Sequence, residues 1–227
     1  MAADAVANGG TIVYGDIFDD GNLNFRNYTD PTTVGGELTT VATGTGNIVW
    51  AKVVTAPTRE EKMAVQLDER GRLDVKTCTT GCNAAADWTL RGTYTTTATD
   101  ANADNMRAFD VAYEQLSGDA IVFFTDDNTT GTIYFCAWNG SSWSPSPACG
   151  ATFAPDTTND ILTSSVGVSG QPEWIRAVAD GSKLTGFRSD EMLVAVSDAS
   201  DDLYLSHWTG SDVEQAANPT DGLTTTD

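Results

Sequence analysis

The sequence predicts an all-β fold made of four repeats, each with about four antiparallel strands. Three observations lead to this prediction: a strand–turn–strand motif occurs four times, an acidic turn stands at the same place in each copy, and no helical pattern runs without interruption. Proline, glycine and threonine break every stretch with a 3.6-residue apolar period, so no helix of normal length is expected. With 227 residues the chain can bury a core without help, and we expect one repeat domain over residues 1–227.

The repeat is defined by three columns of residues in the strand that follows each acidic turn. This strand begins with a bulky aliphatic residue at Leu23, Leu73, Ile133 and Leu203. An apolar residue follows two positions later in every copy, at Phe25, Val75, Phe135 and Leu205. Five positions after the first residue stand Tyr28, Cys78, Trp138 and Trp208. From these columns we expect repeats at approximately 9–45, 46–100, 101–160 and 161–227.

The acidic turns are predicted to close β-hairpins, because Asp, Asn and Gly tolerate the backbone conformations of tight turns. Segment 132–138 is apolar on both faces of a strand, as expected where a sheet is covered on each side. Four-stranded units that repeat every 50 to 70 residues are typical of β-propeller blades. A two-sheet β-sandwich is the alternative, because its core strands are also apolar.

The first repeat is expected to begin at its second strand. Residues 1–10 are too rich in alanine and glycine for a convincing inner strand. Either the C-terminal segment 221–227 closes the ring, or a strand from another subunit does so. The second alternative predicts a self-assembling subunit.

The charge of the chain excludes several classes of partner. It has 32 acidic and 12 basic side chains, a net charge of −20 that repels phosphate groups and argues against nucleic acid and anionic membranes. No apolar stretch reaches the roughly 20 residues that cross a bilayer, so no membrane insertion is expected. Its 33 threonines, few lysines and three glycosylation sequons at Asn27, Asn128 and Asn139 are typical of a secreted surface. We expect an extracellular or cell-surface protein whose leader is not present in this chain.

Four cysteines, Cys78, Cys82, Cys136 and Cys149, can pair in three ways. The simplest pairing is local, Cys78 with Cys82 and Cys136 with Cys149. A zinc site is the alternative, but the spacings Cys-x3-Cys and Cys-x12-Cys differ from the usual Cys-x2-Cys knuckle. Disulfides are therefore expected, and they favour an oxidising compartment.

The third repeat resembles secreted prokaryotic repeat proteins whose blade-like units end in a Trp-Asn/Asp-Gly-x-x-Trp-Ser signature. The matching residues are Trp138-Asn139-Gly140-Ser141-Ser142-Trp143-Ser144. The fourth repeat keeps only Trp208-Thr209-Gly210-Ser211, and the first two lose the signature. This resemblance implies a propeller-type fold and an extracellular location rather than an activity.

The repeats also resemble fungal fucose-binding propeller lectins, whose blades likewise combine an apolar strand, an acidic turn and an aromatic-rich strand. The resemblance implies sugar binding between blades by Arg, Glu and Trp side chains. Comparable candidates for ligand binding in this chain are Trp138, Trp208, Tyr28, Arg107 and Arg176. The two arginines align with Lys52 in a basic row. For the aromatic column, however, packing between blades is favoured over a sugar platform, because its member Cys78 stacks no sugar.

Catalytic and metal-binding patterns are weak, and we expect no enzyme activity. His207 is the only histidine, and no Gly-x-Ser-x-Gly elbow accompanies it. With 32 acidic residues, a pair of carboxylates at glycosidase spacing would carry no information. No cofactor is expected. Clustered carboxylates make Asp126, Asp127, Asp198 and Asp201 weak calcium candidates, but no turn fits the usual calcium loop and turn chemistry alone explains them.

These observations favour a non-catalytic extracellular repeat protein that serves as a surface-structural or adhesive module. It is expected to meet a cell-surface partner or to self-associate as a filament or surface-layer subunit. The alternative is a lectin-like propeller with glycan partners, and a glycosidase is less favoured than either.

Overall fold

The computed structural model describes residues 2–3, 10–15, 21–30, 33–40, 46–95, 106–125, 133–144, 171–179, 190–199, 203–210 and 213–215. In these residues the regular structure consists of strands and one short 3-10 helix, Ala85–Asp87. No helix in this part of the chain is long and apolar enough to cross a bilayer. The chain divides into two compact units, Met1–Thr95 and Thr96–Asp227.

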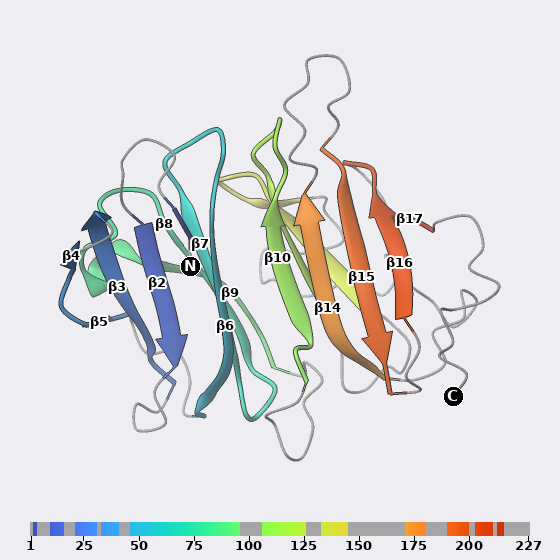
Figure 1. Ribbon diagram of the computed structural model, residues 1–227, viewed down its shortest axis with the longest axis horizontal. Coiled ribbons are helices and arrows are strands. Elements are labelled where there is room, and N and C mark those ends of the chain that lie inside the picture. The colour runs from blue at the N-terminus through green and yellow to red at the C-terminus, as the bar shows by residue number, and fades with distance from the viewer. Residues whose placement is uncertain are drawn as a thin grey trace. The chain divides into compact units, whose positions relative to one another are not determined.

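The first unit contains two antiparallel sheets. Sheet I has the strand order β1-β2-β3-β4, and β5 pairs with β3 beside β4; the strands are β1 (Ala2–Ala3), β2 (Gly10–Gly15), β3 (Leu23–Asp30), β4 (Thr33–Val34) and β5 (Leu38–Thr39). Sheet II has the order β6-β7-β8-β9, with β6 (Ile48–Thr55), β7 (Lys62–Asp68), β8 (Leu73–Cys78) and β9 (Thr89–Tyr94). Apart from β5, which pairs with β3, the neighbouring strands of each sheet follow chain order; Figure 1 labels them.

The second unit repeats this plan. Sheet III has the order β10-β11-β12-β13, with β10 (Phe109–Tyr113), β11 (Ala120–Thr125), β12 (Ile133–Trp138) and β13 (Trp143–Ser144). Sheet IV has the order β14-β15-β16-β17, with β14 (Pro172–Ala179), β15 (Met192–Asp198), β16 (Leu203–Trp208) and β17 (Val213–Gln215). The predicted all-β fold with four antiparallel sheets is confirmed. The first repeat column marks the start of the third strand in every sheet, at Leu23, Leu73, Ile133 and Leu203.

The prediction that the first repeat begins at its second strand is wrong. Strand β1 stands in the place of the first strand, with Ala2 opposite Thr11 and Ala3 opposite Gly10. Antiparallel pairing uses backbone N–H and C=O groups, which alanine supplies as well as any other residue, so composition was a poor guide. Strand exchange between subunits, one of the two ways in which the first repeat was expected to be completed, is therefore not needed to supply its first strand. Segment 221–227 lies outside the described residues.

In each unit the two sheets pack face to face, and the two faces in contact carry different positions of the repeat. Leu23 and Phe25 of β3 face Val53 and Ala64 of sheet II in one buried cluster. In the second unit the equivalent Ile133 and Phe135 of β12 face sheet IV, where they meet a set on β14–β16: Ile175, Ala177, Met192, Val194, Val196, Tyr204 and Trp208. The face that carries the first and second repeat columns thus packs on the alternate residues of the next sheet. Within the units the sheets approach most closely along β2 and β6, and along β10 and β14.

The fourth repeat differs from the others in what covers it. Leu203 and Leu205 are 38% and 39% exposed, although Leu23 and Phe25 in the same columns are fully buried. Strand β16 instead buries the alternate residues Tyr204, Ser206 and Trp208. The columns therefore predict position and spacing correctly, but their burial depends on whether a further sheet covers that face.

The predicted Cys78–Cys82 disulfide is confirmed, with Cα atoms 5.7 Å apart. It closes a turn in which Gly81 and Cys82 adopt positive φ angles of 74° and 50°. Cys136 is also disulfide-bonded, as predicted, while Cys149 lies outside the described residues. A zinc site built on Cys78 and Cys82 is therefore excluded.

Replacing Cys78 and Cys82 together by alanine is expected to lower the free energy of unfolding by about 2 kcal/mol, because a five-residue loop loses its constraint in the unfolded chain. Urea unfolding under non-reducing conditions measures the change. The cross-link at Cys136 remains in this variant and serves as the internal control. An unchanged urea midpoint would contradict the expectation.

A buried carboxyl joins the two sheets of the second unit. Glu114 follows β10 and is 3% exposed, and the indole Nε1 of Trp208 on β16 donates to its Oε1 at 2.5 Å. The hydroxyl of Ser117 donates to the other carboxyl oxygen. Burial, aided by the charges of Asp190 and Asp119, raises the pKa of Glu114 from its ordinary value of 4.5 to about 7. The two hydrogen bonds act in the opposite direction on the pKa but do not cancel the effect of burial.

The stability of the second unit is expected to fall as this carboxyl ionises. Because the pKa of Glu114 is higher in the folded chain, its contribution is complete below pH 4.5 and is lost as the pH rises through about 7. Urea midpoints measured across this range should decline in the parent, and the decline should be smaller in Glu114→Gln, which keeps an oxygen acceptor for Trp208. Identical pH profiles for the two proteins would refute this account.

Candidate functional site

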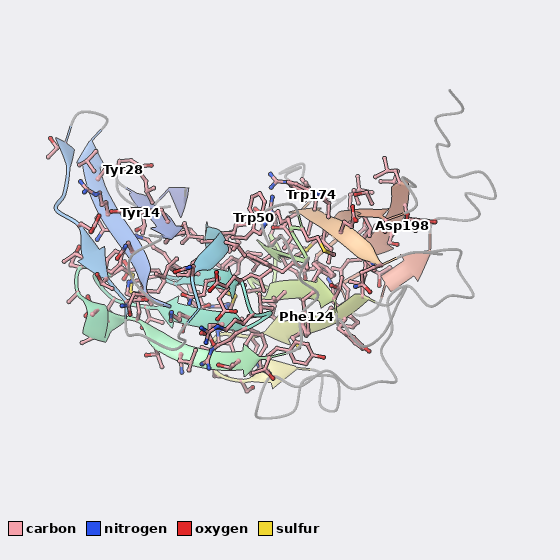
Figure 2. All side chains as sticks on the ribbon, turned by 90° about the horizontal axis from the view of Figure 1, so that it is seen from below. Tyr14, Tyr28, Trp50, Phe124, Trp174 and Asp198 are labelled. Atoms are coloured by element: carbon pink, nitrogen blue, oxygen red, sulfur yellow. A yellow bond between two sulfur atoms is a disulfide. The ribbon has the colours of Figure 1, made fainter. Side chains whose placement is uncertain are left out.

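The candidate site lies on the open face of sheet I, which we define by Ile12, Tyr14, Arg26, Tyr28, Val34 and Glu37. Tyr14 pairs with Asn24 across the β2–β3 hairpin, and Arg26 stands two residues beyond Asn24. Alternate residues of a strand share a face, so Tyr14 and Arg26 project together, opposite the buried Phe25. Figure 2 labels Tyr14 and Tyr28 on this sheet. Glu37 directly precedes β5, whose Leu38 pairs with Phe25.

Three of these side chains form a hydrogen-bonded set, the Tyr14–Arg26–Glu37 cluster. The Tyr14 hydroxyl donates to Glu37 Oε2. Arg26 Nε donates to the Tyr14 hydroxyl oxygen at 3.0 Å, and Arg26 Nη2 donates to Glu37 Oε2 at 3.5 Å. The side chains of Arg26 and Glu37 are 42% and 43% exposed. The cluster is thus held in place by its own contacts and remains open to solvent.

The contacts set the protonation state of each member. Partial burial, followed by the hydrogen bond to Glu37, raises the pKa of Tyr14. The hydrogen bond from Tyr14 is the main cause that lowers the pKa of Glu37; desolvation opposes it, and the contacts with Arg26 add to the lowering. The hydrogen bond to Tyr14 raises the pKa of Arg26. At neutral pH the cluster presents a guanidinium, a carboxylate and a neutral phenol, which together supply donors, acceptors and an aromatic ring.

The same positions in sheet II are occupied by a buried polar pair. The strand register places Gln66 at the position of Tyr14 and Lys76 at the position of Arg26. These residues are 2% and 1% exposed, and Lys76 Nζ donates to Gln66 Oε1 at 2.6 Å. Burial lowers the pKa of Lys76 to about 8. Gln66 Nε2 donates to the carbonyl of Gly21 at 3.3 Å, so this pair holds sheet II against the β2–β3 hairpin.

Sheets III and IV do not reproduce the cluster. At the two equivalent positions sheet III has Phe124 and Cys136, and sheet IV has Val196 and Ser206. Among the described strands, sheet I alone combines an arginine and a tyrosine at this place. The repeat columns did not identify this arginine and tyrosine, because the first two columns follow the buried face of the sheet. The available signal was the alternation of the polar residues Asn24 and Arg26 with the apolar residues Leu23 and Phe25.

The predicted ligand residues Trp138 and Trp208 are buried, with exposed fractions of 3% and 2%. Trp138 packs on Trp143 with ring centroids 5.2 Å apart, and Trp208 packs edge-on against Phe135 at 4.9 Å. Neither ring offers a face to solvent, so packing, the interpretation favoured for this column, describes both. Tyr28 is half-buried on the open face of sheet I, opposite Val34.

The two predicted arginines have different surroundings. Arg107 forms an ion pair with the buried Asp110 at 2.7 Å, whereas Arg176 is exposed on β14. Lys52 and Arg176 do occupy equivalent positions. Each lies in the first strand of its sheet, across the second strand (β7 or β15) from the residue of the second repeat column. In sheet III that position belongs to Asp110, so the alignment of Arg107 in the basic row is wrong. Arg107 precedes β10, where its backbone bridges to Trp174, and spacing alone did not reveal this shift.

Asp198 is the calcium candidate that the structure describes. It is 2% exposed and accepts a hydrogen bond from the Tyr204 hydroxyl at 3.4 Å. Asp126, Asp127 and Asp201 lie outside the described residues. Among the residues that are described, no group of three or more His, Cys, Asp or Glu side chains is arranged to hold a metal ion. Calcium binding stays a prediction.

An open groove of about 300 Å³ lies on the other face of sheet I, the face that carries Leu38. It is lined by Asn27, Thr33, Gly35, Gly36, Leu38 and Asn83. The Asn27 amide already donates to the Cys82 carbonyl at 2.6 Å and to Asn83 Oδ1 at 3.0 Å. These bonds leave the groove with fewer directing groups than the Tyr14–Arg26–Glu37 cluster.

The fold resembles solved structures of two lectins and a galactanase. A fungal lectin from Aleuria aurantia, with a six-bladed β-propeller fold and fucose recognition, is 13% identical, with a TM-score of 0.53 over 92% of this chain and 56% of the lectin. A lectin from Burkholderia pseudomallei is 11% identical, with a TM-score of 0.53 over 92% of this chain and 54% of that one. An exo-β-1,3-galactanase from Phanerochaete chrysosporium is 11% identical, with a TM-score of 0.50 over 94% and 49%.

These similarities define the class of fold, a propeller-type arrangement of antiparallel sheets with four or five strands each. At such low identity they show the fold alone. The chain spans just over half the length of the lectins it matches. No protein-family model and no curated protein sequence matches it. The likeness to fucose-binding propeller lectins is thus confirmed at the level of the fold, while the Trp-Asn-Gly-x-x-Trp-Ser resemblance stays a prediction.

The electrostatics of the cluster can be tested without a ligand. Burial raises the pKa of Tyr14 most, and the hydrogen bond to the Glu37 carboxylate raises it further. Replacing Glu37 by glutamine leaves only a weaker, neutral acceptor, so the Tyr14 phenol should ionise at lower pH. Alkaline absorbance titration measures this, and the Tyr14→Phe variant identifies the signal. Glu69→Gln, which alters a glutamate bound by Asn47 at 3.1 Å in another turn, should leave the titration unchanged. Equal effects of the two glutamine variants would contradict the geometry.

Proposed function

We propose that this protein is a non-catalytic, propeller-type carbohydrate-binding protein, and that it binds a glycan at the Tyr14–Arg26–Glu37 cluster. The observation that carries the proposal is an exposed arginine–carboxylate pair held beside an aromatic ring. It occurs on a fold shared with sugar-binding lectins.

The chemistry of the cluster suits neighbouring hydroxyl groups. A guanidinium has five N–H donors, of which Arg26 uses two within the cluster. An ionised carboxylate accepts several hydrogen bonds, so Glu37 retains acceptor capacity beside its bonds to Tyr14 and Arg26. A sugar hydroxyl both donates and accepts, and the ring of Tyr14 adds an apolar surface for the C–H side of a pyranose.

The charge balance favours an uncharged sugar. Arg26 and Glu37 compensate each other within the cluster, so no net positive charge remains for an acidic sugar. The net charge of −20 on the chain further repels anionic glycans. Neutral monosaccharide units therefore fit this site better than sialic or uronic acids.

The proposal includes the absence of glycosidase activity. A glycosidase needs a carboxylic acid with a raised pKa within reach of the glycosidic oxygen. Among the described carboxyls, Glu114 has a pKa raised to about 7, but it is enclosed against Trp208 and only 3% exposed. The accessible Glu37 has its pKa shifted downward, which suits a hydrogen-bond acceptor rather than a general acid.

Other parts of the sequence-based interpretation stay predictions. The extracellular or cell-surface location and the adhesive role agree with a glycan partner and an oxidised cysteine pair. The filament or surface-layer role has no comparable support in the described residues. Glycan binding, the alternative in the sequence interpretation, therefore becomes the leading hypothesis.

A screen on an array of neutral and acidic glycans, followed by calorimetric titration of the best neutral ligand, tests the function. Arg26→Ala and Glu37→Gln should each weaken binding roughly tenfold or more, because each removes a charge-assisted hydrogen bond. Arg70→Ala removes the same charge from an exposed turn and should bind like the parent. Affinity that survives both site changes, or an array without neutral ligands, would overturn the proposal. Hydrolysis of chromogenic glycosides would overturn its non-catalytic part.

A further inference from the structure

The turn between β12 and β13 joins an exposed asparagine to a glycine. Asn139 and Gly140 follow Trp138, the last residue of β12, and β13 begins at Trp143. Gly140 has a positive φ of 94°, a backbone conformation that favours glycine over residues with a side chain. The hairpin therefore requires glycine after Asn139, and no side chain shields the backbone nitrogen of that glycine.

The side-chain oxygen of Asn139 lies among three close hydrogen-bond donors. The backbone nitrogens of Ser141 and Ser142 each donate to Asn139 Oδ1 at 2.9 Å, and Ser141 Oγ donates to it at 2.8 Å. Donors at this distance stabilise the negative charge that develops on an amide oxygen when its carbon is attacked, as in an oxyanion hole. The turn thus polarises the Asn139 amide toward a nucleophile.

A nucleophile stands one residue further along the chain, the backbone nitrogen of Gly140. No described group accepts a hydrogen bond from it, so its N–H is left to solvent. The bond from the Ser141 nitrogen to Oδ1 folds the Asn139 side chain back over the Asn139–Gly140 peptide, which holds Cγ near this nitrogen. The Gly140 nitrogen and Asn139 Cγ are therefore placed to close a succinimide ring.

Asn83, the other described asparagine that is exposed, lacks this combination. The nitrogen of the next residue, Ala84, donates to Asp87 Oδ2 at 2.9 Å. Asn83 Oδ1 accepts a hydrogen bond from Asn27 Nδ2 at 3.0 Å. Asn83 is thus an internal control, an exposed asparagine whose neighbouring backbone nitrogen is already engaged.

We propose that Asn139 is a site of spontaneous covalent modification, which converts it through a succinimide to aspartate and isoaspartate. The Gly140 nitrogen loses its proton to hydroxide and forms a bond to Asn139 Cγ. The bond between Cγ and Nδ2 breaks, and Nδ2 takes up a proton from water and leaves as ammonia. Water then opens the ring: attack at Cγ restores the original peptide bond and gives aspartate, whereas attack at the main-chain carbonyl carbon gives isoaspartate.

Conversion to isoaspartate alters the hairpin in which it occurs. It adds a carbon to the main chain of a turn in which the Asn139 nitrogen donates to the Ser142 carbonyl at 3.1 Å. This turn brings Trp138 opposite Trp143, and β13 has only two residues with which to pair. The outer strand of sheet III should therefore loosen as the modification accumulates. The proposal does not depend on glycan binding, because the Tyr14–Arg26–Glu37 cluster belongs to sheet I.

Incubation of the folded protein in neutral buffer, followed by peptide mapping with mass spectrometry, tests the modification. Asn139 should convert at least roughly tenfold faster than Asn83 in the same sample, because its nucleophile is free and held close. Isoaspartate, detected with a protein isoaspartate methyltransferase, should appear together with aspartate. The tryptophan fluorescence of the parent should change with the converted fraction, and that of Asn139→Gln should not.

A variant of the turn tests whether the structure takes part in the chemistry. Ser141→Ala removes one donor to Asn139 Oδ1 and should slow conversion roughly fivefold in the folded chain, the effect of one hydrogen bond on a rate. In urea the unfolded variant should convert like the unfolded parent, because the turn no longer places the hydroxyl. Circular dichroism verifies that the variant folds, and Asn83 serves as the control in both states.

Three outcomes would overturn the proposal. The first is an Asn139 that converts no faster than Asn83 in the folded chain. The second is conversion to aspartate without isoaspartate, which would indicate direct hydrolysis of the side-chain amide by water. The third is a folded Ser141→Ala variant that converts like the parent, which would remove the donors of the turn from the chemistry.

Discussion

The structure depends on which faces of each sheet must be covered by a neighbour. A sheet with apolar residues on alternate positions of one face can leave its other face in water, but a sheet that is apolar throughout needs a neighbour on each side. The strands β10, β11 and β12 of sheet III are buried along their whole length, and sheet IV is buried on one face only. This difference places exposed leucines in columns that are otherwise core, and it separates surfaces that stabilise the fold from surfaces available for recognition.

The candidate site in sheet I follows from the same constraint. In sheet II the positions of Tyr14 and Arg26 hold Gln66 and Lys76, which are enclosed and satisfy each other. In sheet I these positions remain accessible, so an arginine and a carboxylate can keep their full charge while their geometry is fixed by hydrogen bonds. An identical backbone arrangement thus serves as internal packing in one sheet and as a polar surface in another.

The sequence was sufficient to predict the class of fold because hairpin turns and apolar columns are local signals. It placed the start of the third strand in all four sheets and the local Cys78–Cys82 bridge. It missed β1, whose pairing depends on backbone groups rather than side chains. It also misplaced Arg107, because the register of a first strand is set by its partner across the sheet. Glu37 escaped notice because it meets Arg26 only through the pairing of β5 with β3, which no spacing announces.

A contact between a phenylalanine and a tryptophan shows that the repeats are alike in structure even where their sequences differ. Phe25 and Phe135 occupy the same column, and each meets a tryptophan of the next sheet edge-on, at 5.6 Å and 4.9 Å. The tryptophans come from different places: Trp208 ends β16, whereas Trp88 precedes β9 and stands beside the small Cys78. Trp88 thus meets Phe25 as Trp208, which shares a column with Cys78, meets Phe135. Duplicated sheets can therefore diverge by exchanging which residue fills a shared space, so the structural period outlasts the period in the sequence.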